Sequence, residues 1–136
     1  MKNILVACAI IEKEGRILAA QRSESMSMPL KWEFPGGKID NGETPEQCLR
    51  RELIEELGIE VEVGRPLPQE SYPYSEFSIT LLPFFCTLSG GEITLHEHRA
   101  FAWLKPGELD RFDWTEADLQ LIRNRNIHRG VICAPS

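Results

Sequence analysis

The pattern of apolar and polar segments predicts a β-hairpin at the amino-terminal end of the chain. Apolar residues dominate 4–11 and again 17–21, and the polar segment 12–16 between them contains a glycine. Two short apolar runs joined in this way are typical of paired antiparallel strands. The polar, proline-containing stretch 23–31 is then expected to be a loop, and 32–43, which is rich in glycine, is expected to be irregular.

Several local signals agree on a helix over 45–57. Thr44 supplies a hydroxyl at the N-cap, Pro45 occupies the first helical position, and Gln47 completes a capping box. Gly58 is typical of a helix end, because glycine readily adopts the left-handed conformation found there. This helix is therefore the best defined element that the sequence predicts.

The second half of the chain adds strands and a terminal helix. Residues 59–63 alternate between apolar and polar, and 77–88 and 99–104 are further strand-like runs. The spacing of apolar residues predicts a helix over 115–126 with Thr115 as its cap. Strands interleaved with helices predict an α/β fold in which helices pack on a mixed sheet.

Composition narrows the classes of function. The chain has 136 residues, which suits one domain over 1–136, and a net charge of −6, which argues against a nucleic-acid polymer or a membrane surface as partner. Its four cysteines form no C-x-x-C pair, so we expect buried, reduced thiols instead of a zinc or redox site. No apolar run reaches the roughly 18 residues of a membrane span, and a cytoplasmic protein is expected.

The predicted helix carries a concentrated acidic face. Glu52, Glu55 and Glu56 fall within an arc of roughly 100° when the helix is projected, and its apolar residues occupy a mostly separate arc. Like charges at these spacings destabilise a helix unless something offsets them. Divalent cations such as Mg²⁺ or Mn²⁺, which prefer oxygen ligands, are one explanation. A solvated acidic face balanced by Arg50 and Arg51 is the other.

The spacing around this helix favours the first explanation. Gly37 is followed after five residues by Glu43, and after seven more by the run RELIEELGI at 51–59. The arrangement resembles the Nudix box, G-x(5)-E-x(7)-R-E-U-x-E-E-x-G-U with U aliphatic, at every fixed position. The segments WEFPGGKIDNGETPEQ and AAQR are similar to the MutT-type branch of that family.

The resemblance implies a Nudix fold, an α/β/α arrangement in which a mixed β-sheet is sandwiched between helices. It also implies a hydrolase whose carboxylates hold Mg²⁺, with Mn²⁺ as a possible substitute. By matching positions, Glu52, Glu55 and Glu56 resemble the metal ligands, and Glu52 is the candidate for activating water. Arg51 resembles the arginine that orients these carboxylates, and Glu43 is expected to support the loop or an outer metal shell.

Further site residues are implied outside the acidic helix. The carbonyl of Gly36 resembles another metal ligand, and Glu97 stands where MutT-type members bring in a further carboxylate. Lys38 is either a phosphate contact or a solvated loop lysine. The histidines at 96 and 98 form an H-x-H pattern that can indicate zinc, but no third ligand is apparent, and we expect neither to hold a metal.

Three residues resemble those that receive the nucleotide in MutT-type enzymes. Arg22 and Phe34 match positions that line the pocket, although a surface arginine and a core phenylalanine are equally consistent with the pattern. Asp118 stands where a MutT-type asparagine reads the base. An ionised aspartate only accepts hydrogen bonds and suits the exocyclic amine of cytosine. Oxidised guanine is the other candidate base, bonded in a different way or by a protonated aspartate. The simpler alternative is an acid at a helix start, three residues after Thr115.

The resemblance therefore implies a nucleoside triphosphate pyrophosphohydrolase that releases a monophosphate and pyrophosphate, with 8-oxo-dGTP, CTP or modified dCTP as substrate. Two alternatives remain. One is a Nudix hydrolase of another small molecule, such as a nucleotide sugar or dinucleoside polyphosphate. The other is a nucleotide-binding module without catalysis, although the box is intact. The sequence leaves a monomer and a homodimer equally open.

Overall fold

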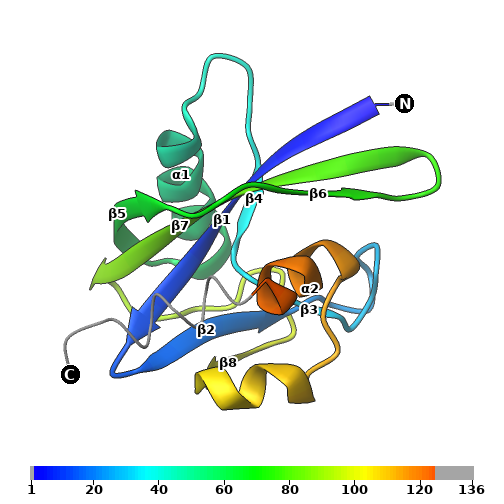
Figure 1. The fold of residues 1–136 in the computed structure, drawn as a ribbon. Helices are drawn as coiled ribbons and strands as arrows, with labels where there is room; N and C mark the ends of the chain where they lie inside the picture. The colour runs from blue at the N-terminus through cyan, green and yellow to red at the C-terminus, as the bar shows by residue number, and fades with distance from the viewer. Residues whose placement is uncertain (1, 125–136) are drawn as a thin grey trace.

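The computed structural model describes residues 2–124, and it contains a mixed sheet accompanied by three helical segments (Figure 1). The strands are β1 (Lys2–Lys13), β2 (Arg16–Gln21), β3 (Trp32–Glu33), β4 (Gly36–Lys38), β5 (Glu60–Pro66), β6 (Glu70–Pro73), β7 (Phe77–Gly90) and β8 (Ala100–Leu104). The helices are α1 (Pro45–Leu57), the 3₁₀ helix η1 (Pro106–Arg111) and α2 (Glu116–Arg123). Strands β1 and β7 run parallel, and the other pairs are antiparallel.

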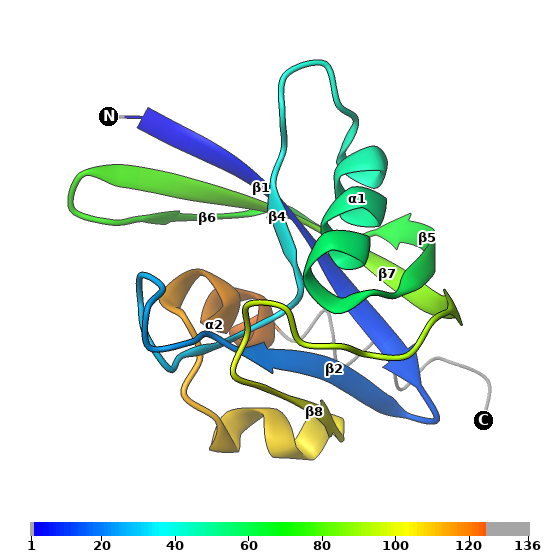
Figure 2. The same ribbon diagram turned by 180° about the vertical axis from the view of Figure 1, so that it is seen from behind.

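Strand β1 contributes to both apolar faces of the sheet, because its side chains alternate in direction. Ala7, Ala9 and Ile11 pack in a buried cluster with the apolar residues of α1. Cys8 and Ile10 belong to a second cluster, which contains the buried residues of α2. The two helices thus cover opposite faces of the sheet (Figures 1 and 2). This arrangement confirms the predicted α/β/α architecture.

Helix α1 has the bounds that its sequence signals predict. The Thr44 hydroxyl accepts a hydrogen bond from the Gln47 amide at 3.1 Å, and the Gln47 side chain accepts one from the Thr44 amide at 2.9 Å. Gly58 ends the helix in the left-handed region with φ of 66°. The capping box and the terminal glycine are therefore confirmed as the determinants of this helix.

The expectation of irregular structure over 32–43 was wrong in part. Trp32–Glu33 forms β3 beside β2, and Gly36–Lys38 forms β4 beside the middle of β1. Gly36 has φ of 155°, and a Cβ there would lie 2.0 Å from the Ala7 carbonyl oxygen of β1. The glycine that made the stretch look irregular is what lets the two backbones approach closely enough to pair.

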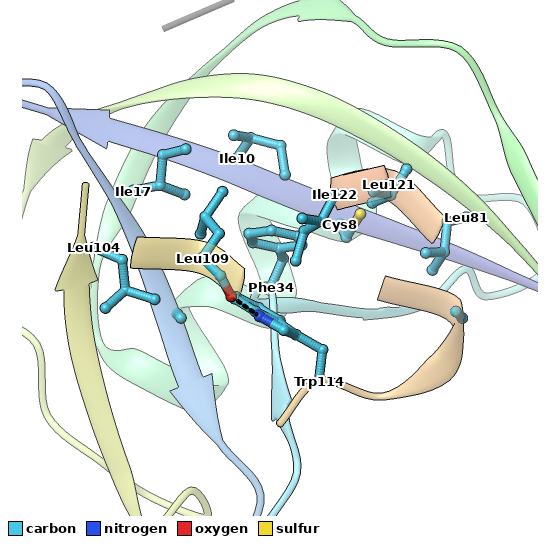
Figure 3. Packing of buried hydrophobic residues seen from close by; sticks show 12 residues of the cluster. Cys8, Ile10, Ile17, Phe34, Leu81, Leu104, Leu109, Trp114, Leu121 and Ile122 are labelled. Atoms are coloured by element: carbon cyan, nitrogen blue, oxygen red, sulfur yellow. Dashed lines mark hydrogen bonds between the residues drawn. The ribbon is translucent and has the colours of Figure 1, made fainter. Parts of the chain in front are cut away.

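The segment that precedes α2 is fixed by an aromatic residue. The Trp114 indole donates a hydrogen bond to the Leu109 carbonyl of η1 at 2.7 Å, and its ring lies 4.7 Å from that of Phe34 (Figure 3). Helix α2 begins after Thr115, as predicted, and the last residues of the predicted range 115–126 lie outside the described part of the chain.

Two expectations from composition concern the cysteines and the length of the helices. Three of the cysteines, Cys8, Cys48 and Cys86, are free and buried, as expected, and Cys133 lies outside the described residues. Within residues 2–124, every helix falls short of the length and apolar character that crossing a membrane requires.

Candidate active site

A cavity of about 450 Å³ opens beside β1 and brings most of the predicted site residues together. Seven of those residues line it: Arg22, Phe34, Gly36, Lys38, Glu52, Glu56 and Asp118. They come from five parts of the chain, and the sheet and both α-helices contribute. The acidic side chains of α1 and the carboxylate of α2 thus share one cavity.

Arg51 organises the acidic face of α1 without lining the cavity. Its guanidinium donates two hydrogen bonds to the Glu43 carboxylate, at 2.7 and 2.9 Å, and one to Glu52 at 2.9 Å. A longer contact of 3.4 Å reaches Glu55, whose side chain is exposed. The bonds from Arg51, together with one from the Asp40 amide, lower the pKa of Glu43 to about 2. Arg51 thereby holds the Glu52 carboxylate in one orientation.

The backbone of Gly37 lies directly against the Glu52 carboxylate. A Cβ added at Gly37 would be 2.4 Å from the carboxyl carbon of Glu52 and 2.7 Å from both of its oxygens. Gly37 itself is paired with Ala7 of β1, so its backbone position is set by the sheet. Glycine at this position leaves free the space that the Glu52 carboxylate occupies.

The pKa of Glu56 shows that carboxylates lie close together on the acidic face of α1. Burial raises its pKa to about 10, with further increases from Glu52 and from the negative charges of Glu33 and Glu97. A divalent cation would offset this repulsion, and the oxygen donors present are those that hard cations prefer. The donor set of Glu52, Glu56 and the Gly36 backbone therefore fits such an ion in its chemistry.

The predicted metal ligands do not form a complete coordination site. Among residues 2–124, no three acidic, histidine or cysteine side chains stand close enough together to hold a metal ion. Glu97 is exposed and lines a separate surface depression with Ser23, Glu24, Ser25, His98 and Arg99. The negative charge of Glu97 is one of several that raise the pKa of Glu56. The predicted ligand role of Glu97 stays a prediction.

A network around Glu33, which the sequence did not predict, lies beside the cavity. Glu33 accepts a hydrogen bond from Arg22 at 2.8 Å and shares one with Nε2 of His98 at 2.7 Å. The His98 side chain is only 1% exposed, and its Nδ1 lies 3.9 Å from Glu56. The one local signal for Glu33 is a charged residue inside an otherwise apolar segment that carries Trp32 and Phe34. Nothing near His98 in sequence points to either carboxylate.

Arg22 and Phe34 both line the cavity and also make contacts within the chain. Arg22 lines the cavity, but its guanidinium also donates to the Ser27 carbonyl at 2.6 Å and to the Ser27 hydroxyl at 3.0 Å, which ties down the loop 23–31. Phe34 also lines the cavity, and its ring packs against Trp114 in the core. Their contacts within the chain make both residues parts of the cavity wall.

Asp118 is buried and lines the same cavity as the carboxylates of α1. One of its oxygens accepts a hydrogen bond from the Phe34 amide at 3.1 Å, and the other accepts one from the Thr115 hydroxyl. Burial, followed by the negative charge of Glu33, raises the pKa of Asp118 to about 7. The residue thus takes part in the helix start and also faces the cavity. Its protonation state changes near neutral pH.

An aromatic wall on the β6–β7 hairpin was also missed. Tyr74 and Phe77 line the cavity, and their rings stack with centroids 5.1 Å apart. The Tyr74 hydroxyl accepts a hydrogen bond from the Ala117 amide at 3.3 Å, which joins the hairpin to α2. The density of aromatic residues over 72–77 was the available signal. Such a surface suits a flat ring.

Comparison with known proteins gives matches along this whole part of the chain. A family profile described as the NUDIX domain matches residues 1–124. The CTP pyrophosphohydrolase of Escherichia coli K12 is 39% identical over 122 residues, covering 90% of each chain. The 8-oxo-dGTP diphosphatase of Haemophilus influenzae is 39% identical over 125 residues, covering 89% of this chain and 90% of the relative. The solution structure of the E. coli ORF135 protein has a TM-score of 0.81 at 36% identity, covering 99% of this chain and 96% of that one.

Proposed function

This chain belongs to the NUDIX family, and from that premise we propose that it hydrolyses a nucleoside triphosphate to the monophosphate and pyrophosphate. It is a hydrolase of phosphoanhydride bonds with a small-molecule nucleotide substrate. We propose cytosine nucleotides and 8-oxo-dGTP as the substrates to test first. The observation that carries this proposal is one cavity lined both by carboxylates of the acidic helix and by a buried aspartate with several aromatic side chains.

The family uses divalent metal, and we propose Mg²⁺, with Mn²⁺ as a substitute. Glu52, Glu56 and the Gly36 carbonyl would hold it, with Glu55 and Glu97 as further ligands. When bound, the ion neutralises charge on the phosphates and lowers the pKa of the attacking water. Crowding of the carboxylates on α1 supports this assignment.

The residues of the chain itself supply position and proton transfer. Arg51 holds Glu52 through a 2.9 Å hydrogen bond, so that the carboxylate faces the cavity as the proposed acceptor of the water proton. Gly36 and Gly37 line the same cavity, and their lack of side chains leaves room for β1 and for the Glu52 carboxylate. Lys38 also lines the cavity and is proposed to contact a phosphate.

Asp118 is proposed to read the base. Each of its oxygens already accepts one hydrogen bond, and a carboxylate has capacity for about four, so acceptor capacity remains for a ligand. With a pKa of about 7, the group can accept from the cytosine amine when ionised and donate to oxidised guanine when protonated. The stacked pair of Tyr74 and Phe77 offers the same base a flat apolar wall.

The proposal is tested by incubation with Mg²⁺ and a nucleotide panel. The panel contains 8-oxo-dGTP, dGTP, CTP, dCTP, 5-methyl-dCTP, ADP-ribose and a dinucleoside polyphosphate, and the products are separated by ion-exchange chromatography. A monophosphate and pyrophosphate are expected from at least one triphosphate, and chelation of the metal with EDTA should abolish the reaction. If only ADP-ribose or the dinucleoside polyphosphate is cleaved, the proposed substrate class is wrong.

Replacing Asp118 by asparagine should raise the preference for 8-oxo-dGTP over CTP by about tenfold or more, since a base contact is worth roughly 1–3 kcal/mol. The wild-type preference should shift toward CTP as pH rises through about 7, because ionised Asp118 can no longer donate a hydrogen bond. This pH dependence should disappear in Asp118→Asn. The measurement is the ratio of kcat/KM values from pH 6 to 8.

Glu116→Gln is the matched control, because Glu116 is an exposed acid in the same first turn of α2. It should leave both the ratio and its pH dependence as in the wild type. An Asp118→Asn protein with an unchanged ratio would restrict Asp118 to its role at the helix start.

A further inference from the structure

His98 is the one residue in the described chain whose side chain has a buried nitrogen or oxygen without a hydrogen-bond partner. The orphaned atom is Nδ1, and the side chain around it is 1% exposed. Nε2, on the other edge of the ring, has a 2.7 Å hydrogen bond with Glu33. Buried polar atoms are normally paired, and an exception calls for an explanation.

The atom that Nδ1 faces is a carboxylate oxygen of the acidic helix. Oε2 of Glu56 lies 3.9 Å away, slightly beyond hydrogen-bond range. A single proton between the two atoms would satisfy both, whichever of them carries it. Glu56 is also one of the proposed ligands of the divalent cation.

The backbone holds His98 firmly against this helix. The Thr94 amide donates to the Leu57 carbonyl at 2.9 Å, and the His96 amide donates to the Glu56 carbonyl at 3.3 Å. On the other side, the Arg99 amide donates to the Gln21 carbonyl at 2.9 Å. The segment is thus anchored to the end of α1 and to β2, so the ring has a fixed position relative to the carboxylates.

We propose that His98 is a positioning residue that orients Glu56 for cation binding. Its Nδ1 engages Oε2 of Glu56 and leaves the other oxygen of that carboxylate free for the ion, while Glu33 fixes the ring through Nε2. The inference rests on the proposed function, because it assumes that Glu56 is a ligand. Partners of this kind orient metal-binding carboxylates, and their loss typically weakens metal affinity by about 10–100-fold.

A purely structural role makes a different prediction. In that case His98 would serve to fill the site and to hold Glu33, and only its Nε2 contact would matter. The two edges of the ring can be separated by substitution. Asparagine places an amide where Nδ1 lies and loses the reach toward Glu33, whereas glutamine extends an amide to the position of Nε2 and loses the group beside Glu56.

The test measures Mn²⁺ binding to the whole protein without nucleotide, from the decrease of the free Mn²⁺ signal in electron paramagnetic resonance. We expect His98→Gln to bind Mn²⁺ about 10–100-fold more weakly than the wild type. His98→Asn should bind it nearly as tightly as the wild type. Equal losses in both variants, or better binding in His98→Gln, would overturn the inference, as would a wild-type protein that binds no Mn²⁺. His96→Ala is the control, because His96 is exposed and contacts only backbone near Glu56.

A double-mutant cycle covers the case in which His98→Asn does not fold, which circular dichroism will show. If His98 acts through Glu56, His98→Gln should weaken Mn²⁺ binding little further in a Glu56→Gln background. Additive losses would overturn the inference. Failure of the wild-type protein to cleave any triphosphate, with Mn²⁺ binding and the His98 effects as expected, would count against the proposed function alone.

Discussion

Replacing Glu52 by glutamine should lower kcat by at least about 10²-fold, because the change removes the charge of a proposed metal ligand and the proposed acceptor of the water proton. Glutamine has nearly the same shape as glutamate. Its amide oxygen can still accept the 2.9 Å hydrogen bond that Arg51 now donates to Glu52. The fold should therefore persist while the chemistry is lost. Steady-state rates at saturating Mg²⁺ and nucleotide give the measurement.

Glu46→Gln is the matched control for this experiment. Glu46 lies on the same helix, in its first turn, and does not line the cavity. Its replacement also removes one negative charge, so any general effect of net charge appears in both variants. Turnover in Glu46→Gln should match the wild type. Retention of wild-type kcat in Glu52→Gln would show that another group accepts the proton and that the charge of Glu52 is dispensable.

The acidic helix could be predicted from sequence because its determinants are local. Thr44, Pro45, Gln47 and Gly58 lie within one turn of the helix ends, and each acts on backbone groups close to it in the chain. The spacing of the carboxylates on one face follows directly from the helical repeat. Both the bounds of α1 and its acidic face could therefore be predicted without knowledge of the rest of the fold.

The network at Glu33 could not be predicted in this way, because its contacts are remote in sequence. His98 is 65 residues from Glu33, and the two meet only because β2 pairs with both β3 and β8. Strand pairing depends on the whole fold instead of local propensity. The H-x-H spacing bears only on direct metal binding by His98, whereas the structure places this residue beside a candidate ligand, Glu56.

Asp118 illustrates how a local explanation can be correct and incomplete. The sequence offered a helix-start role and a base-reading role as alternatives, and the structure supports the first through the contacts with Thr115. The same carboxylate is buried against the Phe34 amide, 84 residues away, in the wall of the cavity. A helix-start acid needs no such burial. Its unusual environment, which raises its pKa to about 7, belongs to the tertiary structure.

Adjacent glycines should give opposite results when each is replaced by alanine. In Gly37→Ala the three atoms nearest to the new Cβ all belong to the end of the Glu52 side chain, the first at 2.4 Å, so the carboxylate must turn away while the backbone stays. A displacement of about 1 Å at a reacting group can cost on the order of 10²-fold in rate. We therefore expect kcat to fall by about that factor with little change in the melting temperature.

Gly36→Ala should instead destabilise the fold. Its Cβ would lie 2.0 Å from the Ala7 carbonyl oxygen, which is fixed in β1, and φ of 155° is unfavourable for alanine. The free energy of unfolding should fall by at least about 2 kcal/mol, as measured by urea titration. Gly107→Ala is the control for both variants, since its Cβ would meet nothing within 4 Å. A Gly37→Ala protein with unaltered kcat would mean that the position of the Glu52 carboxylate is not critical for hydrolysis.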